Sequence, residues 1–373
     1  MPKTEEYCEI VAAGARYRFW KDVEVNRNFG QPVSELRLSV AEISPQGGKD
    51  WSSIRLKPRD PVEAYLAGRK VATGKVSARQ VGYDANNHGV RFIVQSKVAD
   101  IVNGTVQAKP GQYRKYSTSK ICGAVCAPYG IGFKIIGAPS GADKIFERVS
   151  VQFGESPFDL IERLCRMRNL HLVDDAQGNL IASRGGTAAA VADLQEGRNI
   201  KRAEMIWSEA QKIDQATAHG DQHGTDECWG DECRGNSATA KNPNWSGGFR
   251  ALDFLSEHTG DKRDMQMRAN HEVDANVGGT LTASVTVQGW LLQEGSLWIE
   301  HVGKFVNVYS PMLFPQDKMI LAIQGVTHRQ NDKSGTETTL DLVLPRAIGG
   351  ADHPEAKDGP SGANPATPDV ADT

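Results

Sequence analysis

Alternating apolar and polar residues dominate the first hundred positions and predict short β-strands. Clusters of Gly, Pro, Asn and Asp separate these runs, which cover 17–27, 33–40, 62–66, 70–76 and 90–95. Ala67-Gly68-Arg69 stands where two runs need a tight connection. Short strands with turns about every ten residues are typical of a barrel or sandwich. We therefore expect residues 1–105 to form an N-terminal β-barrel domain.

A helical period replaces this alternation after Glu155. Ser156 can cap a helix, Pro157 suits its first position, and Asp159 places an acid in its first turn. Apolar side chains then recur on one face of the expected helix, at Phe158, Ile161, Leu164 and Cys165. The pattern predicts a helix over about 156–169 that packs against a core.

A hairpin is expected directly after this helix. The apolar runs 171–173 and 180–182 flank a loop of turn-forming Asp, Gln, Gly and Asn residues. We interpret 106–190 as a smaller α+β middle domain.

Strict alternation returns at 280–288, where apolar and Thr or Ser residues take turns, so that one face is buried and the other is wet. Further strands are expected at 305–309, 320–329 and 336–344. We expect 191–348 to form a second β-barrel domain. A polar, weakly periodic excursion interrupts it at about 216–278 and includes a helix around 261–276.

The charge of the chain is unevenly distributed. Residues 349–373 hold five carboxylates and one lysine, which gives this segment a charge of −4. Because the net charge of the chain is −3, the remainder is near +1. Its Gly, Pro, Ala and Asp composition predicts a disordered acidic tail. The near-neutral remainder predicts no specific nucleic-acid binding. The first residues lack an export signal and no long apolar run follows, so we expect neither secretion nor membrane insertion.

The clearest metal-like constellation combines His219, His223, Cys228 and Cys233. Two imidazoles and two thiolates are a ligand set of tetrahedral zinc. The spacing is loose and the segment is Gly-rich and polar, so a solvated loop is the favoured interpretation and no metal or other cofactor is predicted. Cys122 and Cys126 lie four positions apart, and both are expected to pack among apolar neighbours.

Catalytic residues are not predicted. The candidate carboxylates have structural explanations in a hairpin turn, before a helix N-cap or on an otherwise basic helix face. They are Asp174, Asp175, Asp221, Glu155 and Glu162. The nucleophile, zinc-hydrolase and phosphate-loop motifs are absent from the sequence. The chain is therefore not expected to be an enzyme.

Five of the seven tryptophans fall into two groups. Trp20, Trp290 and Trp298 lie in strand patterns and are expected in a core or interface. Trp229 and Trp245 lie in the polar excursion, where a large ring calls for a partner, so we expect them to be contact anchors for another subunit or protein.

The order of these units resembles the baseplate hub proteins of Mu-like phages, which are related to other contractile-tail hubs and to the hub part of type VI secretion spikes. The resemblance covers about 15–348. It rests on the order of four segments, at Val71–Val76 with Val90–Val102, Gly154–Cys165, Thr286–Trp290 and Leu340–Ala347.

The resemblance implies two similar β-barrels in each subunit and a homotrimeric ring with pseudo-six-fold symmetry. Such a ring would join a six-fold tail tube, or a tube-proximal adapter, to a three-fold central spike, beside other baseplate proteins. DNA would pass through its channel. The expected location is the virion tail baseplate, after synthesis in the host cytoplasm. A type VI or tailocin hub is the main alternative, and a metal-binding hydrolase is a further one.

Overall fold

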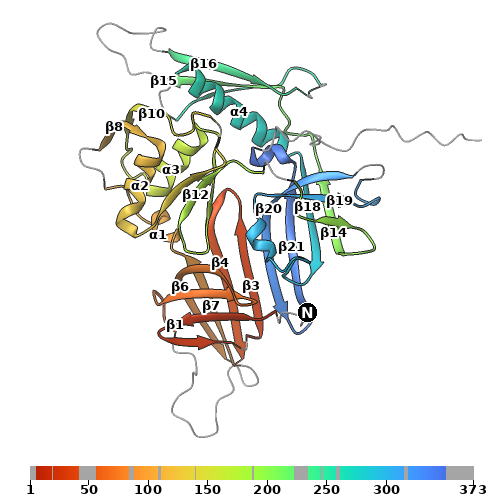
Figure 1. Cartoon of the computed structure of the whole chain (residues 1–373). Helices are drawn as coiled ribbons and strands as arrows, with labels where there is room; N and C mark the ends of the chain where they lie inside the picture. Colours follow the sequence, from red (N-terminus) through yellow and green to blue (C-terminus); the bar gives the residue numbers. More distant parts are fainter. Residues whose placement is uncertain are drawn as a thin grey trace, which may run out of the picture.

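The computed structural model describes residues 6–18, 20–41, 56–83, 88–107, 111–138, 140–186, 189–221, 234–243, 245, 247–257, 261–314 and 318–349. Strands outnumber helices among these residues, so the expectation of a mainly β protein is confirmed (Figure 1). In the described part of the chain, every helix is too short or too polar to cross a membrane.

The N-terminal strands form an antiparallel, curled sheet in the order β3-β4-β7-β6-β5-β1-β2. The predicted turn at Ala67-Gly68 joins two of them. Alternate side chains of this sheet enter the core, as the sequence pattern requires. The strands are β1 (Cys8–Ala12), β2 (Ala15–Tyr17), β3 (Asp22–Asn28), β4 (Gln31–Ala41), β5 (Pro61–Leu66), β6 (Arg69–Tyr83) and β7 (His88–Ser96).

The C-terminal strands form a second curled portion in the order β14-β18-β21-β20, with β19 on β20 and β13 on β19. The alternation predicted at 280–288 is confirmed in β18 except at Thr286, which is buried between Val285 and Val287. The elements are β13 (Asp193–Gln195), β14 (Ile200–Trp207), β18 (Leu281–Gln288), β19 (Phe305–Tyr309), β20 (Met319–Asn331), β21 (Gly335–Val343), and the 3-10 helices η3 (Trp298–His301) and η4 (Pro345–Ile348).

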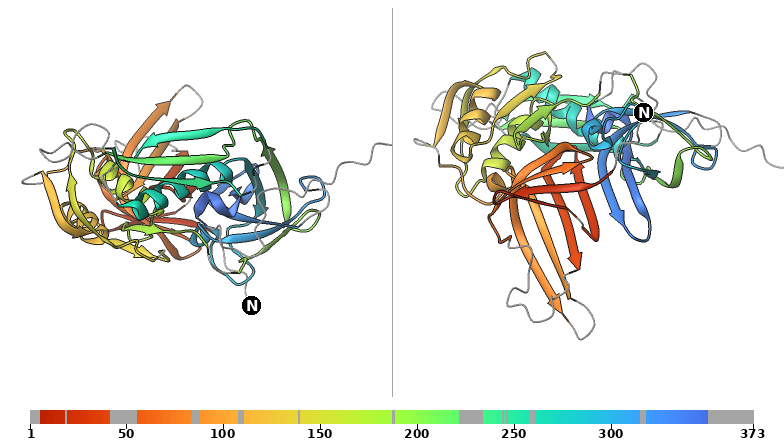
Figure 2. Two further views of the ribbon diagram at one scale, coloured as in Figure 1. Left: turned by 90° about the horizontal axis from the view of Figure 1, so that it is seen from above. Right: turned by 60° about the horizontal axis from the view of Figure 1, so that its bottom comes forward.

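The two curled portions are one sheet, because β3 pairs antiparallel with β20 from Val23 opposite Gln330 to Asn28 opposite Gly325. The views of Figures 1 and 2 agree that these strands lie side by side. The expectation of two closed barrels is corrected here, since none of the described sheets closes on itself. The physical reason is that β3 uses one edge for β4 and the other for β20, which leaves neither edge to close its own half.

The middle part combines short sheets with three α-helices. The predicted helix is α3, and its capping box is formed by Ser156 and Asp159, with Pro157 in the first turn. The predicted hairpin is confirmed by β11 and β12. The elements are α1 (Ala99–Val102), β8 (Gln112–Ser117), α2 (Thr118–Cys126), η1 (Ala127–Tyr129), β9 (Phe133–Ile136), β10 (Ile145–Ser150), α3 (Pro157–Arg166), β11 (His171–Asp174) and β12 (Leu180–Ser183).

The excursion contains a three-stranded sheet and the predicted helix. Asp261 caps this helix through the backbone N–H of Asp264. The elements are β15 (Gln215–Asp221), β16 (Arg234–Lys241), β17 (Ala251–Leu255) and α4 (Lys262–Gly278).

Two main cores hold these parts together. One runs through both portions of the large sheet, from Cys8 to Leu344. The other joins the middle part to the excursion, because α4 packs Met265 and Ala269 into the same cluster as Leu160 of α3 and Ala218 of β15. Figure 2 shows α4 lying across the molecule above the large sheet.

Candidate functional site

The register of the large sheet aligns polar side chains in rows that cross from the C-terminal to the N-terminal strands. Successive strand partners occupy the same face of a sheet, so each row is continuous across strand boundaries. The rows are Glu204, Ser284, Asp341, Gly325 and Asn28; Arg202, Thr286, Thr339, Thr327, Asn26, Glu35 and Gln95; and Gln288, Glu337, Arg329, Glu24 and Arg37.

Ion pairs connect these rows across the junction of the two halves. Glu24 of β3 accepts from Arg329 of β20 at 3.0 Å and lies 3.4 Å from Arg37 of β4. Arg37 also donates to Glu35 at 2.7 Å, and Gln95 of β7 donates to Glu35 at 3.1 Å. Single exposed pairs contribute little stability, whereas a network holds its side chains in fixed positions. Cations and carboxylates therefore alternate on this face.

Hydroxyl groups occupy the C-terminal part of the same face. The Oγ1 atoms of Thr286 and Thr339 lie 3.2 Å apart across neighbouring strands. The opposite face of the same strands buries Val285 and Leu340. The sheet thus has one apolar face in the core and one polar face, which we call the polar face and define by the three rows above.

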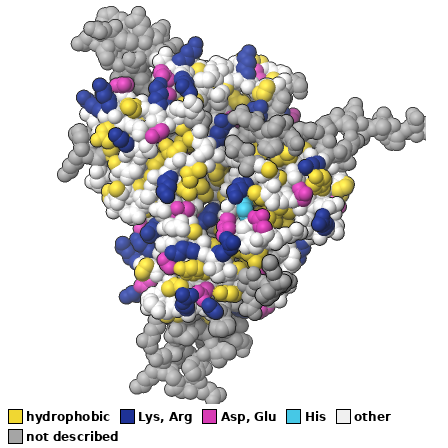
Figure 3. Space-filling model, viewed as in Figure 1, with side chains coloured by type: hydrophobic (Ala, Val, Ile, Leu, Met, Phe, Trp, Pro, Cys, Tyr) yellow, Lys and Arg dark blue, Asp and Glu magenta, His cyan; other side chains and the backbone are white. Residues whose placement is uncertain are grey.

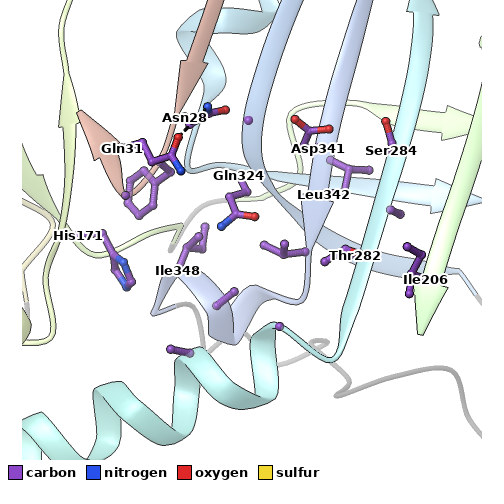
Figure 4. Close-up of a pocket in the computed structure, with 18 of the residues that line it drawn as sticks. Asn28, Gln31, His171, Ile206, Thr282, Ser284, Gln324, Asp341, Leu342 and Ile348 are labelled. Atoms are coloured by element: carbon purple, nitrogen blue, oxygen red, sulfur yellow. Dashed lines mark hydrogen bonds between the residues drawn. The ribbon is translucent and has the colours of Figure 1, made fainter. Parts of the chain in front are cut away.

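A groove of about 770 Å³ lies at one end of the polar face. Figure 4 shows Asp341 and Ser284 projecting from neighbouring strands in the same direction. Nearby, the side-chain amide of Asn28 donates a hydrogen bond to that of Gln31. Desolvation raises the pKa of Asp341, although the positive charge of Arg329 and a hydrogen bond from Ser284 act in the opposite direction. The groove therefore presents acceptor groups at the end of the polar face.

Aromatic rings close the other side of this groove. The ring of His171 in β11 lies 5.5 Å from that of Phe29 and 5.0 Å from that of His271 in α4. Burial, together with the charge of Arg184, lowers the pKa of His171 to about 4. Elements from the N-terminal sheet, the middle part and α4 meet here through neutral rings.

The large sheet ends at β14, which pairs with β18 and has no second partner among the described strands. Two large apolar side chains at its end are exposed, Ile206 by 61% and Trp207 by 45%. A strand edge with exposed apolar side chains is a template for pairing with another chain. The β14 edge therefore has the features of a surface that can pair with another strand.

A buried polar cluster fixes the middle part on the large sheet. The carboxylate of Asp174 in β11 accepts from the hydroxyl of Ser34 at 2.6 Å and from the Ser34 backbone N–H at 3.1 Å. Arg27 of β3 donates to the same carboxylate at 3.2 Å and to the carbonyl of Val71 at 2.5 Å. Asp174 therefore has a structural role in a buried ion pair.

Three other candidate carboxylates have structural partners, whereas the side chain of Asp221 lies outside the described residues. Glu155 accepts from the buried guanidinium of Arg163, and Asp175 accepts from backbone N–H groups within its own hairpin turn. Glu162 forms an ion pair with Arg166 at 2.6 Å on α3. These contacts position backbone and helices and do not converge on one cleft.

The metal candidates are only partly within the described residues. His219 lies half-buried in β15, opposite Ser237 of β16. His223, Cys228 and Cys233 lie outside the described residues, so the constellation is not described as a whole. Elsewhere in the described ranges, His, Cys, Asp and Glu side chains form no group of three or more suited to a metal. Cys122 and Cys126 are buried, and desolvation raises the pKa of Cys126 to about 12.

The two tryptophans of the excursion differ in what can be described. Trp229 lies outside the described residues. Trp245 donates its indole N–H to the carbonyl of Gly248 at 2.9 Å, beside the 81% exposed Phe249. Trp290 and Trp298 are buried in the core of the large sheet.

The surface in Figure 3 carries interspersed cations and carboxylates, with hydrophobic side chains gathered near α3 and β12. Sequence patterning predicted the wet face of β18 but missed the rest of the polar face. The missing information was the pairing of β3 with β20, which joins residues about three hundred positions apart. Polar residues do occupy every second position of both strands, Asp22, Glu24 and Asn26 in β3 and Thr327 and Arg329 in β20, but this alternation does not identify the partner strand.

Comparison with known proteins agrees with this architecture. Residues 98–184 match the family described as the second domain of gp44-like baseplate hub proteins. The baseplate hub protein gp44 of Escherichia phage Mu is 21% identical over 336 residues, covering 89% of this chain and 86% of the phage protein. The chain is similar to a Mu-like baseplate hub protein over most of its length. The resemblance expected from the order of the sequence segments is thereby confirmed.

Solved structures of phage tail proteins and of a type VI secretion component share the fold. A 43 kDa tail protein of prophage MuSo2 from Shewanella oneidensis aligns over 92% of this chain and 100% of its own, with a TM-score of 0.78 and 23% identity. A tail protein from Neisseria meningitidis covers 92% of this chain and 99% of its own, at 0.73 and 16%. A type VI secretion system component of E. coli covers 90% of this chain and 76% of its own, at 0.55 and 11%.

Proposed function

We propose that the chain is a structural, non-enzymatic baseplate hub of a phage contractile tail. Three copies form a ring that joins a six-fold tail tube, or a tube-proximal adapter, to a three-fold central spike. The named relatives support this proposal, because they are a baseplate hub protein and tail proteins. The chain would then act in the virion baseplate after assembly in the host.

The polar face carries the mechanistic part of the proposal. In the ring, this face would line the channel through which DNA passes. DNA binds proteins mainly through its phosphates, so a cationic wall would retain it. Arg329 pairs with Glu24, and Arg37 pairs with Glu24 and Glu35, so two carboxylates balance the two guanidinium groups and the wall would have mixed charge. Such a wall suits passage better than binding.

The β14 edge is the proposed contact between subunits. Pairing of this edge with a neighbouring copy would remove an exposed strand edge and bury Ile206 and Trp207. A head-to-tail contact repeated around a three-fold axis closes a ring. Trp229 and Trp245, on the excursion, are proposed to contact the spike or other baseplate proteins.

The domain division is part of the same proposal. We assign 1–105 and 191–348 to two similar, open barrel-like units, 106–190 to the middle domain, and 349–373 to a disordered acidic tail. The continuity of the sheet through β3 and β20 supports two equivalent units placed side by side, which is the arrangement that three subunits need to meet six-fold symmetry.

A hub of a type VI or tailocin particle is the second candidate, favoured by the fold shared with the E. coli type VI component. The ring physics is the same in both cases. A metal-binding hydrolase at the His219 loop is a weaker alternative, which elemental analysis of the purified chain tests directly.

The decisive experiment is light scattering of the purified chain, combined with negative-stain images of the same fraction. The expected result is three times the chain mass of 40.6 kDa, in rings with a central hole. The proposal would be contradicted by a mass of 40.6 kDa at all concentrations, both for the chain alone and for the chain mixed with a tube or spike partner.

A further inference from the structure

The two-stranded sheet of β8 and β10 combines positive charge with an exposed apolar side chain. Its strands carry the cations Arg114, Lys115 and Arg148 against the carboxylate of Glu147, and all four residues are exposed. Ile145 of β10 is 55% exposed. We call Arg114, Arg148 and Ile145 the basic surface. A surface of this kind suits a partner that offers carboxylates beside an apolar group.

The strand register makes the two arginines of the basic surface neighbours. Arg148 of β10 is the direct partner of Arg114 of β8, and like charges at such positions repel each other. In the part of the chain that the structure describes, neither side chain forms an ion pair. Phe146 and Val149 are buried, so the adjacent Ile145 and Arg148 project outward. Carboxylates from outside the chain would relieve this repulsion.

The opposite charge lies at the β14 edge. Apart from the neutral ring of His171, the titratable residues that line the groove there are Glu204 and Asp341, and both are acidic (Figure 4). Ile206 also lines the groove, is 61% exposed, and lies two positions from Glu204 on the same face of β14. We call Glu204, Asp341 and Ile206 the acidic surface.

The cations of β14 leave this negative charge in place. Lys201, at the start of the strand, pairs with Glu337 at 3.0 Å. Arg202 precedes Glu204 by two positions and is not part of the groove lining. Desolvation raises the pKa of Asp341 in spite of the nearby charge of Arg329. A cation brought to the groove by another chain would stabilise the ionised carboxylate.

The two surfaces match each other in kind but lie far apart on one chain. Each has an exposed isoleucine beside two like charges, and the charges have opposite sign. Figures 1 and 2 place β8 and β10 on one flank of the molecule and β14 on the other. They therefore cannot meet within one chain. Different, complementary patches on opposite flanks are what a repeated head-to-tail contact requires.

We propose that the basic surface of one copy contacts the acidic surface of a second copy of this chain, so that Arg114 and Arg148 face Glu204 and Asp341. The two isoleucines, Ile145 and Ile206, would cover each other at this contact. The inference rests on the proposed ring assembly, and it names the surface that the β14 edge meets. Opposite charges at such a contact fix its register and exclude the pairing of two identical surfaces.

The test is a charge exchange in the full-length chain, followed by light scattering over a concentration series. Arg148→Glu and Glu204→Lys each place like charges across the contact, so we expect either change to lower the association constant by about tenfold or more. A chain that carries both changes has opposite charges again and should associate as the unmodified chain does. Lys333→Glu, an exposed charge reversal in the turn between β20 and β21, is the matched control and should have no effect.

The outcomes separate this inference from the proposed function. Rings of the unmodified chain that persist in Arg148→Glu would overturn this inference alone and assign the basic surface to a different partner. Weaker assembly of both single variants without recovery in the double variant would show that Arg148 and Glu204 do not face each other. A mass of 40.6 kDa for the unmodified chain under all conditions would overturn the inference together with the ring. All variants change exposed residues, so their unfolding midpoints should match that of the unmodified chain.

Discussion

Arg27 and Asp174 form a buried ion pair across 147 positions of sequence, with Nε of Arg27 3.2 Å from Oδ1 of Asp174. The side chain of Asp174 is fully buried, and Ser34 supplies its other hydrogen bonds. Burial of a charge is tolerated when partners of this kind satisfy it. The middle part is thus fixed to β3 and β4 by polar contacts with defined geometry.

Removal of the Asp174 charge should therefore destabilise the chain strongly. We expect Asp174→Ala to lower the free energy of unfolding by about 3–5 kcal/mol, because Arg27 is left buried without its carboxylate. Urea unfolding followed by circular dichroism measures this loss. Asp332→Ala, in the exposed turn after β20, is the control and should stay within about 0.5 kcal/mol of the unmodified chain. Equal effects of the two substitutions would contradict the role assigned to Asp174.

Gly74 of β6 should tolerate no side chain. A Cβ at this position would lie 1.9 Å from the carbonyl oxygen of Gln95 in β7, a backbone atom that cannot move without shifting the strand. We expect Gly74→Ala to cost about 3 kcal/mol or more, the upper part of the range for overpacking. Gly82→Ala in the same strand is the matched control, since nothing lies within 4 Å of its Cβ. Thermal unfolding of both variants checks this, and a stable Gly74→Ala chain would show that β6 and β7 separate easily.

A buried histidine links three segments of the C-terminal half. Nε2 of His328 accepts from the N–H of Ile299 at 3.3 Å, so its Nδ1–H donates to the hydroxyl of Thr338 at 2.8 Å. Thr338 in turn donates to the carbonyl of Gly289 at 2.6 Å. This arrangement needs a neutral ring, and burial together with the charge of Arg27 lowers the pKa of His328 to about 3.

Acid should therefore weaken the fold through His328. Between its unfolded pKa of 6.5 and its folded pKa of about 3, the unfolded chain holds a proton that the folded chain lacks. The free energy of unfolding then falls as the pH drops through this window, at up to about 1.4 kcal/mol per pH unit. We expect His328→Gln to be less stable at neutral pH but to lose less on acidification, as measured by urea unfolding at several pH values. An unchanged pH slope in the variant would refute the assignment.

Local chemistry explains which elements the sequence could predict. The Ser156 and Asp159 capping box acts within one turn, so the start of α3 was visible in the residues themselves. The turn at Ala67-Gly68 is equally local, with both residues at positive φ. Elements determined by neighbours within a few positions are therefore predictable.

Two features depended on distant partners. The sheet of β15, β16 and β17 was not expected in the excursion, because the residues it buries against α4 are small, including Ala216, Ala218 and Ala240. Alanine alternation carries a weak hydrophobic signal, and its burial is decided by the helix that covers it. The joining of β3 to β20 likewise leaves no local pattern, so separate closed barrels were expected where one continuous sheet exists.

The β14 edge offers the most direct test of ring assembly. We expect Ile206→Lys to abolish or weaken the ring, because an edge-strand lysine opposes pairing and the apolar contribution of Ile206 is lost. Full burial of such a side chain contributes about 1.5–3 kcal/mol, so the association constant should fall by about tenfold or more for each contact. Light scattering over a concentration series measures this change.

The exposure of Ile206 in the single chain predicts an unchanged unfolding midpoint, which separates loss of assembly from loss of folding. Phe249→Lys, an exposed apolar site on the excursion, is the control and should assemble normally. Rings that persist unchanged in Ile206→Lys would place the subunit contact elsewhere on the molecule.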